Sequence, residues 1–260
     1  MRKMKNISRL LSSMSEETPV EKQFLSDLKR SIELTEEKNS RIPSQTYKPS
    51  GMNCIRQSYY QITGYPQDPF DTAFTLIGIQ NSGTDIHVRI QDAVEKMKEN
   101  GMDCEYVNVG EYVQRKGLDY LEVKEQMGNE THLYHKDLNI SFLCDGIIKY
   151  KKKYYIIEFK TESSRKFYER DGVNPDHYQQ AKTYSLCLGL DKVLFVYISR
   201  DNLDMKAYMF EVTDDMRQDI VGYITNCDSY IEQKKVPPKP EKNTKACTYC
   251  RYKNQCELDN

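Results

Sequence analysis

The segment from Asp145 to Lys160 constrains the fold of this chain more than any other. Ile, Tyr and Phe dominate both ends of the segment, and a run of three lysines starting at Lys151 separates them. Apolar runs on either side of a short polar turn are typical of a β-hairpin. A two-residue turn at Lys151 and Lys152 places Asp145 directly opposite Glu158 and leaves Lys160 on the same face.

These opposed carboxylates predict a metal site. Directly opposed residues have Cβ atoms about 4.5–5.5 Å apart, so Asp145 and Glu158 repel each other unless a cation lies between them. Mg²⁺ is typically held by one or two carboxylates together with substrate phosphate, and Lys160 would then lie near the metal-bound water. The alternative is an amphipathic surface hairpin, and only ligands from other parts of the chain distinguish the two interpretations.

Composition restricts the class of protein. The length of 260 residues suits one sizeable domain with appendages, and 30% charged residues imply a thick polar shell. A net charge of −1 gives no indication of a nucleic-acid partner, although lysines and arginines cluster near the hairpin. The sequence shows no signal-peptide pattern and no apolar run of about 18–20 residues. We therefore expect a cytoplasmic protein without membrane association, in the host cytoplasm if the gene is viral.

A long helix is expected over residues 71–99, with a possible break near Asn81. One of its faces has residues at alternating steps of four and three, namely Gly83, His87, Ile90, Val94 and Met97. His87 on this face is either a hydrogen-bonded core residue or a ligand. Gly83, one turn earlier, would allow a strand or a ligand to approach closely.

The remaining pattern alternates helices and strands. Helices are expected at 16–40, 50–64, 174–189 and 214–233, and strands at 120–126, 131–135, 139–150, 154–161, 192–199 and 206–212, with a turn at Gly128 and Asn129. Gln180 and Tyr184 lie one turn apart on one helix face. The strand at 192–199 is almost continuously apolar, as in a strand that is buried on both faces.

The cysteines indicate a second metal site. Eight cysteines in a cytosolic protein favour metal binding over a disulfide framework. Cys247, Cys250 and Cys256 form Cys-x2-Cys-x5-Cys in a tail that follows a proline-rich spacer. Three thiolates leave a four-ligand site one ligand short, and Cys54 is the natural fourth.

Taken in order, these motifs resemble the RecB-like branch of the PD-(D/E)XK nucleases. The resemblance is closest to the iron–sulfur CRISPR-associated exonucleases and their phage and archaeal relatives, and it extends from Cys54 to Cys256. That family has a Gly-x-x-x-His helix, an acidic strand, a Glu-x-Lys strand, a Gln-x-x-x-Tyr helix and a terminal Cys-x2-Cys-x5-Cys. This chain matches these motifs in the same order: first with Gly83 and His87, then with Asp145, then with Glu158 and Lys160, then with Gln180 and Tyr184, and last with the three tail cysteines.

The resemblance implies an α/β fold with a restriction-endonuclease-like core, in which helices flank a central mixed sheet. This core is expected over residues 46–235. An N-terminal helical extension, residues 1–45, precedes it. Residues 236–260, the spacer and Cys-cluster tail, close onto Cys54.

The resemblance also implies the roles of the site residues. His87, Asp145 and Glu158, with the backbone carbonyl of Phe159, would hold Mg²⁺ or Mn²⁺. Lys160 would orient or activate the attacking water. Gln180 and Tyr184 would support Lys160 and the DNA strand. Cys54, Cys247, Cys250 and Cys256 would hold a [4Fe–4S] cluster, although Zn²⁺ accepts the same four thiolates.

The function implied is that of a metal-dependent DNA exonuclease. It would hydrolyse phosphodiester bonds in single-stranded DNA or at frayed ends, in recombination, replication, repair or CRISPR spacer processing, with recombination or CRISPR integration proteins as candidate partners. One alternative is a catalytically idle nucleic-acid-binding or assembly subunit, against which the intact His-Asp-Glu-Lys set argues. The other is a sequence-specific or structure-specific endonuclease.

Overall fold

The computed structural model describes residues 19–39, 43–68, 74–127, 130–240, 247 and 250–259. The chain divides into two compact units: Met1–Arg41 with Asp71–Ile79, and Ile42–Phe70 with Gln80–Asn260. The turn expected at Gly128 and Asn129 lies outside the described residues.

The first unit contains α2 (Val20–Asn39) and the beginning of α4 (Phe74–Glu95). The backbone N–H of Phe74 donates to Glu33 Oε1 (3.3 Å), and Lys29 Nζ lies 5.7 Å from the centroid of the Phe74 ring. The helix expected at residues 16–40 is therefore confirmed as α2 over its described part. The long helix α4 is also confirmed, and it continues through Asn81 without a break.

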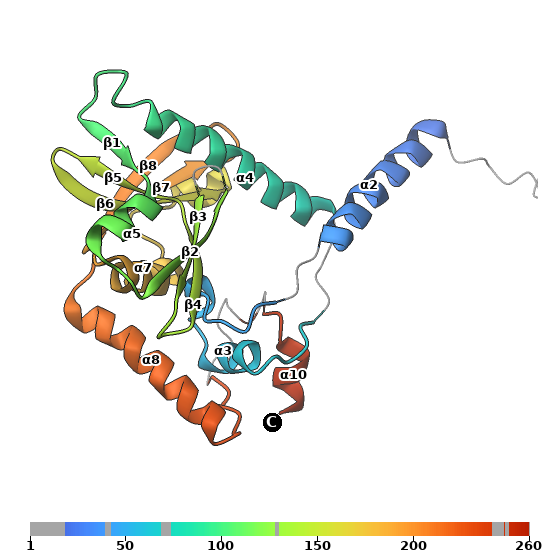
Figure 1. Ribbon diagram of the computed structural model, residues 1–260. Helices are drawn as coiled ribbons and strands as arrows, with labels where there is room; N and C mark the ends of the chain where they lie inside the picture. Colours follow the sequence, from blue (N-terminus) through green and yellow to red (C-terminus); the bar gives the residue numbers. More distant parts are fainter. Residues whose placement is uncertain are drawn as a thin grey trace, which may run out of the picture. The chain divides into compact units, whose positions relative to one another are not determined.

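A five-stranded mixed sheet forms the centre of the second unit (Figure 1). Its strands lie in the order β1 (Cys104–Val107), β5 (Gly146–Tyr150), β6 (Lys153–Glu162), β7 (Lys192–Ser199) and β8 (Met205–Glu211). Strands β6 and β7 are parallel, and the other neighbours are antiparallel. This arrangement confirms the α/β class with a central mixed sheet.

The two faces of this sheet are covered by different helices. Residues of the second unit on α4 pack with one cluster of strand residues that includes Ile148 and Ile157. Their strand neighbours Ile147 and Ile156 belong to the other cluster, with residues of α7 (Tyr178–Leu188) and α8 (Asp214–Glu232). The alternation follows from the two-residue period of a strand, and it gives the expected layer of helices on each face.

A separate antiparallel sheet precedes the hairpin. It consists of β2 (Leu121–Met127), β3 (Glu130–His135) and β4 (Ile140–Cys144). The continuous strand expected over 139–150 was therefore wrong, because the chain passes from one sheet to the other at Asp145. A Cβ atom on Gly146 would lie 2.7 Å from the Tyr106 ring, and the φ of 157° at Gly146 also favours glycine, so both the steric space and the backbone favour glycine where the chain enters the larger sheet.

The hairpin has the expected register. Gly146 pairs with Ile157 and Tyr150 with Lys153. Lys151 and Lys152 both have positive φ, 47° and 68°, as in the two-residue turn that matches strand twist. The register places Asp145, the residue before the first pair, opposite Glu158.

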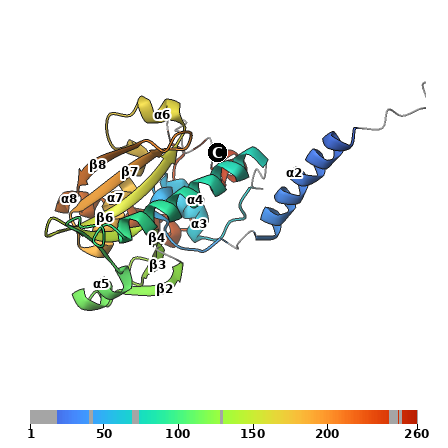
Figure 2. The ribbon, with the colours of Figure 1, turned by 90° about the horizontal axis from the view of Figure 1, so that it is seen from above.

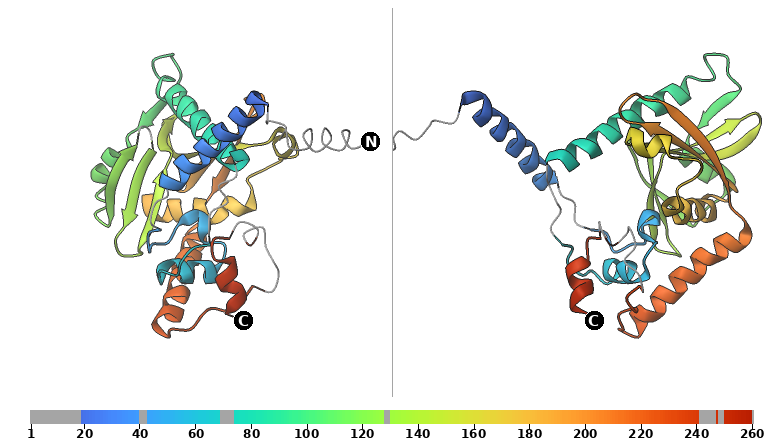
Figure 3. Two further views of the ribbon diagram at one scale, coloured as in Figure 1. Left: turned by 90° about the vertical axis from the view of Figure 1, so that its right-hand side faces the viewer. Right: turned by 180° about the vertical axis from the view of Figure 1, so that it is seen from behind.

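The remaining helices are short. They are α3 (Ile55–Ile62), α5 (Val109–Lys116), α6 (Ser164–Tyr168), α10 (Lys253–Leu258) and the 3₁₀ turns η1 (Pro49–Gly51) and η2 (Pro175–His177). Figure 2 shows α5 and α6 on opposite sides of the second unit, and Figure 3 shows α3 beside α8 and α10. The sequence did not predict β1, α5 or α6. Within the described residues, no helix is long and apolar enough to span a membrane.

Candidate metal centre and cysteine site

Asp145 is fixed at the point where the chain leaves the smaller sheet. Its side chain is buried, and Oδ2 accepts a hydrogen bond from the backbone N–H of Phe159 (2.7 Å). Its carbonyl oxygen accepts a second bond from Gln91 Nε2 on α4 (3.2 Å). Strand β6 and helix α4 therefore hold both the carboxylate and the backbone of Asp145.

Glu158 has one satisfied and one unsatisfied carboxylate oxygen. The residue as a whole is 4% exposed, and Oε1 accepts hydrogen bonds from Lys160 Nζ (2.6 Å) and Gln180 Nε2 (2.7 Å). Oε2 is buried, and no group in the described part of the chain forms a hydrogen bond with it. A buried acceptor without a partner costs about 1–3 kcal/mol, and more when it is charged. A cation beside Oε2 would remove that penalty.

Two further groups converge beside Asp145. His87 on α4, Glu130 at the start of β3 and Asp145 each offer one ligand atom, and these atoms lie within 4.8 Å of one another. Because metal–oxygen distances are about 2.0–2.6 Å, one ion can contact all three groups. The structure thus brings together two of the expected ligands, His87 and Asp145, and adds Glu130, which the sequence did not predict.

The ionisation of these groups suits a divalent cation. Burial, together with the nearby charge of Lys160, lowers the pKa of His87 to about 4, so the imidazole is neutral and able to bind metal. Burial and the charge of Glu158 raise the pKa values of Asp145 and Glu130. Asp145 and Glu130 therefore resist ionisation, and a bound cation would reverse this effect.

Lys160 is an ammonium in this environment. Burial acts to lower the pKa of Lys160, but the charges of Glu158 and Asp145 and the hydrogen bond to Glu158 outweigh it, so the pKa is raised. The Lys160 side chain is 23% exposed, against 5% for that of Glu158. Lys160 therefore reaches solvent as a charged hydrogen-bond donor.

Gln180 and Tyr184 position Glu158. The Gln180 amide donates to Glu158 Oε1 and to the Tyr184 hydroxyl (2.8 Å), and that hydroxyl donates to the carbonyl of Leu143 (2.5 Å). The chain of bonds joins α7 to β4 and to β6. The resemblance implied support of Lys160 and the DNA strand, whereas in the structure Gln180 bonds to Glu158 Oε1, which also accepts a bond from Lys160.

The four candidate cluster ligands lie within electrostatic range of one another. Burial raises the pKa of Cys250, and the thiols of Cys54, Cys256 and Cys247 raise it further. Cys54 is the residue before α3, and Cys256 is on α10. This all-thiol donor set fits both a [4Fe–4S] cluster and Zn²⁺.

Protein contacts also hold the tail against α3. Tyr252 is buried, with its ring centroid 5.8 Å from that of Tyr60. Arg56 donates to the Tyr60 hydroxyl and to the carbonyl of Asp259, and the Tyr60 hydroxyl donates to the Asp259 carboxylate (2.9 Å). Asp68 accepts a bond from the backbone N–H of Asn254 (3.0 Å). The cysteine site is therefore not alone in anchoring the tail.

The raised pKa of Asp145 predicts a pH-dependent stability effect. Below the unfolded-state pKa, about 3.9, Asp145 is protonated in both states. Stability is then lost as the pH rises through the raised folded-state pKa, because the folded state resists ionisation. Asp145→Asn is expected to raise the melting temperature of metal-free protein at about pH 8 and to have little effect at about pH 4.

Thermal unfolding in EDTA across this pH range measures the effect. Asp219→Asn, which changes an exposed carboxylate on α8, is the control. Mn²⁺ should stabilise the wild type more than Asp145→Asn. A difference in melting temperature that does not change with pH would contradict the assignment of burial as its cause.

Comparison with known proteins gives similarities of structure. No family model matches the chain, and no curated protein is significantly similar to it in sequence. A solved structure of a protein designated SSO0001 has 17% identity and a TM-score of 0.48, covering 91% of this chain and 98% of that one. An alkaline exonuclease from Laribacter hongkongensis, LHK-Exo, solved alone and with dAMP, has 14% identity and a TM-score of 0.44, covering 74% and 90%. At these identities the similarity concerns the backbone alone.

Proposed function

We propose that this protein is a Mg²⁺- or Mn²⁺-dependent deoxyribonuclease. The observation that carries the proposal is the convergence of His87, Glu130 and Asp145 within 4.8 Å of one another. Beside them, Glu158 has an unpaired Oε2 and shares its other oxygen with Lys160. A hard divalent cation, a nearby ammonium and buried carboxylates are the groups that phosphodiester hydrolysis needs.

Each residue of the site has its own proposed role. His87, Glu130 and Asp145, with Glu158 and the backbone carbonyl of Phe159, would hold the ion, which polarises the phosphate and lowers the pKa of its water. Gln180 keeps Glu158 in place through its 2.7 Å bond. Lys160, which is charged and partly exposed, would donate to the attacking water or to a phosphate oxygen.

The finer proposal is an exonuclease that acts on single-stranded or frayed DNA ends. Recombination, replication, repair and CRISPR spacer processing all need such an activity. The cysteine site would hold a [4Fe–4S] cluster, with Zn²⁺ as the alternative, and would guide the strand or brace the tail. Arg165 and Lys166 on α6, directly after β6, are exposed cations of the kind that contact phosphate.

Cleavage of labelled DNA tests the function. Linear single strands, linear duplexes and circular single strands are incubated with Mg²⁺, Mn²⁺ or EDTA. We expect short products from linear strands with either ion, none from circles and none in EDTA. Cleavage of circles would replace the exonuclease by an endonuclease, and binding without cleavage in every condition would favour the idle subunit.

Lys160→Ala is expected to lower kcat about a hundredfold with a smaller change in KM, because its donor acts mainly in the transition state. Single-turnover rates at saturating DNA measure the effect. Lys182→Ala provides a matched control, since Lys182 is also partly buried and ion-paired, with Asp219 at 2.9 Å. An unchanged rate in Lys160→Ala would remove Lys160 from the reaction.

A further inference from the structure

His177 lies on the same face of the five-stranded sheet as Glu158 and Lys160. In the parallel pairing of β6 with β7, Glu158 is opposite Phe195 and Lys160 is opposite Tyr197. Paired residues of neighbouring strands project to the same face. The His177 ring stacks on both β7 residues, with centroids 5.9 Å from Phe195 and 5.8 Å from Tyr197.

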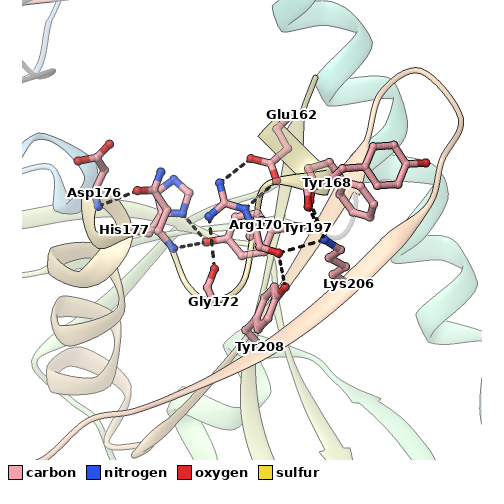
Figure 4. A network of polar contacts seen from close by, with 11 residues as sticks. Glu162, Tyr168, Arg170, Gly172, Asp176, His177, Tyr197, Lys206 and Tyr208 are labelled. Atoms are coloured by element: carbon pink, nitrogen blue, oxygen red, sulfur yellow. Dashed lines mark hydrogen bonds and ion pairs between the residues drawn. The ribbon is translucent and has the colours of Figure 1, made fainter. Parts of the chain in front are cut away.

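Hydrogen bonds fix the orientation of the imidazole (Figure 4). The Tyr197 hydroxyl accepts a bond from the backbone N–H of Asn174 (3.0 Å) and lies 2.9 Å from His177 Nδ1. Among the described residues, Nδ1 is the sole acceptor for the hydroxyl hydrogen of Tyr197. Tyr197 therefore donates to Nδ1, and the neutral ring carries its hydrogen on Nε2.

The neighbours of Tyr197 make this arrangement rigid. Arg170 binds Glu162 through two bonds of 2.7 and 2.6 Å, and its guanidinium lies 4.1 Å from the Tyr197 ring centroid. The carbonyl of Arg170 in turn accepts bonds from Lys206 Nζ (3.0 Å) and the Tyr208 hydroxyl (2.9 Å). Figure 4 shows these contacts as one continuous network that reaches His177.

The Nε2–H group is a donor open to a ligand. No residue in the described part of the chain accepts a bond from it. It is not sealed in the core either, because the buried unpaired side-chain atoms among those residues are Glu158 Oε2 and Gln179 Oε1. Burial and the charges of Lys160 and Arg170 lower the pKa of His177 to about 3, so the ring stays neutral in an electropositive setting.

We propose that His177 Nε2–H binds a phosphate oxygen of the substrate strand next to the phosphate that is cleaved. This inference rests on the proposed nuclease function. His177 is then a substrate-positioning residue: it fixes the strand by a neutral hydrogen bond, and Tyr197 holds its tautomer. Neutral N–H donors commonly fix the register of a strand through its phosphates. A purely structural role would use the ring and Nδ1 and leave Nε2 without a function.

Two substitutions separate the nitrogens. Asn ends near the position of Nδ1 and Gln near that of Nε2, so His177→Asn keeps the contact to Tyr197 and His177→Gln keeps the outward donor. We expect His177→Asn to raise both KM and the Kd for a short single strand about tenfold, with little change in kcat. His177→Gln should stay within about threefold of the wild type. The Kd is measured in EDTA, where no cleavage occurs.

A methylphosphonate scan locates the contact. Replacing each phosphate in turn by a neutral methylphosphonate should weaken wild-type binding most at one position near the cleaved bond. In His177→Asn, a methylphosphonate at that position should weaken binding no more than one at the other positions. An unchanged Kd in His177→Asn, equal losses in the Asn and Gln variants, or identical scans would each overturn the proposal.

Two controls keep the outcomes distinct. Thermal unfolding checks that each variant is folded. Tyr197→Phe keeps the aromatic ring but removes the hydroxyl that fixes the tautomer of His177, and it should weaken binding less than His177→Asn. If His177→Asn does not fold, unchanged binding in Tyr197→Phe overturns the proposal. Failure of the nuclease function itself would appear separately, as wild-type protein that binds DNA in EDTA but does not cleave it with Mg²⁺ or Mn²⁺.

Discussion

Alanine in place of Asp145 or Glu158 is expected to reduce DNA cleavage about a thousandfold, because polarisation of the phosphate by the bound ion contributes several kcal/mol to the transition state. DNA binding should change little, since lysine and arginine contacts to phosphates are separate from the metal site. Both carboxylates are buried, Asp145 at the sheet crossover and Glu158 with its unpaired Oε2. Loss of either leaves an incomplete set of ligands.

Cleavage rates with Mg²⁺ and Mn²⁺, together with the Kd in EDTA, measure both effects. Asp219→Ala, which removes an exposed carboxylate on α8, should retain full activity. Glu130→Gln gives a graded case: it keeps the shape of the side chain, and it should raise the Mn²⁺ concentration required for half-maximal activity. About a tenth or more of wild-type activity in Asp145→Ala or Glu158→Ala would count heavily against the metal assignment.

Cys54→Ala is expected to remove the metal of the cysteine site. Wild-type protein purified without oxygen should be brown, with broad absorption near about 400 nm and roughly four irons per chain. Burial raises the pKa of Cys250 and Cys256, and the nearby thiol of Cys54 raises both further, which places the Cys54 thiol among the tail cysteines. Removing one of four thiolates should therefore abolish the colour and the bound iron.

The protein without the metal should stay folded. The tail is held to α3 by Tyr252, Arg56 and Asp259, so Cys54→Ala should remain monodisperse in gel filtration, with a lower melting temperature. Cys104→Ala and Cys227→Ala alter buried cysteines outside this set and should retain iron. Colourless wild-type protein with one zinc would replace the cluster by a zinc site. Full metal retention in Cys54→Ala would eliminate the four-cysteine site.

Local rules were enough to predict the hairpin. Strand period and a two-residue turn determine which residues face each other, and neither depends on the rest of the fold. The observed pairing of Gly146 with Ile157 therefore follows from the sequence. The division into two sheets was not predicted. At the point of division, a Cβ atom on Gly146 would collide with the ring of Tyr106, which lies on β1, a strand that was itself not predicted.

The missing site residues are those placed by tertiary structure. Glu130 joins His87 and Asp145 only because the smaller sheet folds back beside α4, and no fixed spacing relates the three. The feature of the sequence that could have indicated Glu130 is its place as an acidic residue at the first position of β3, a strand in which buried and half-buried residues alternate. His177 offered a better signal, since it lies three residues before Gln180 and close to one helical turn from it.

The ligands of the metal centre come from three elements that are distant in the chain, the helix α4, the smaller sheet and the crossover into the larger sheet. No contiguous fragment that lacks one of these elements contains the set. During synthesis, His87 emerges from the ribosome well before Asp145 and Glu158, and the groups meet only when both sheets have formed. Under the proposed function, a nascent or partly unfolded chain lacks the assembled set of ligands and does not cleave DNA, so cleavage is confined to the folded protein.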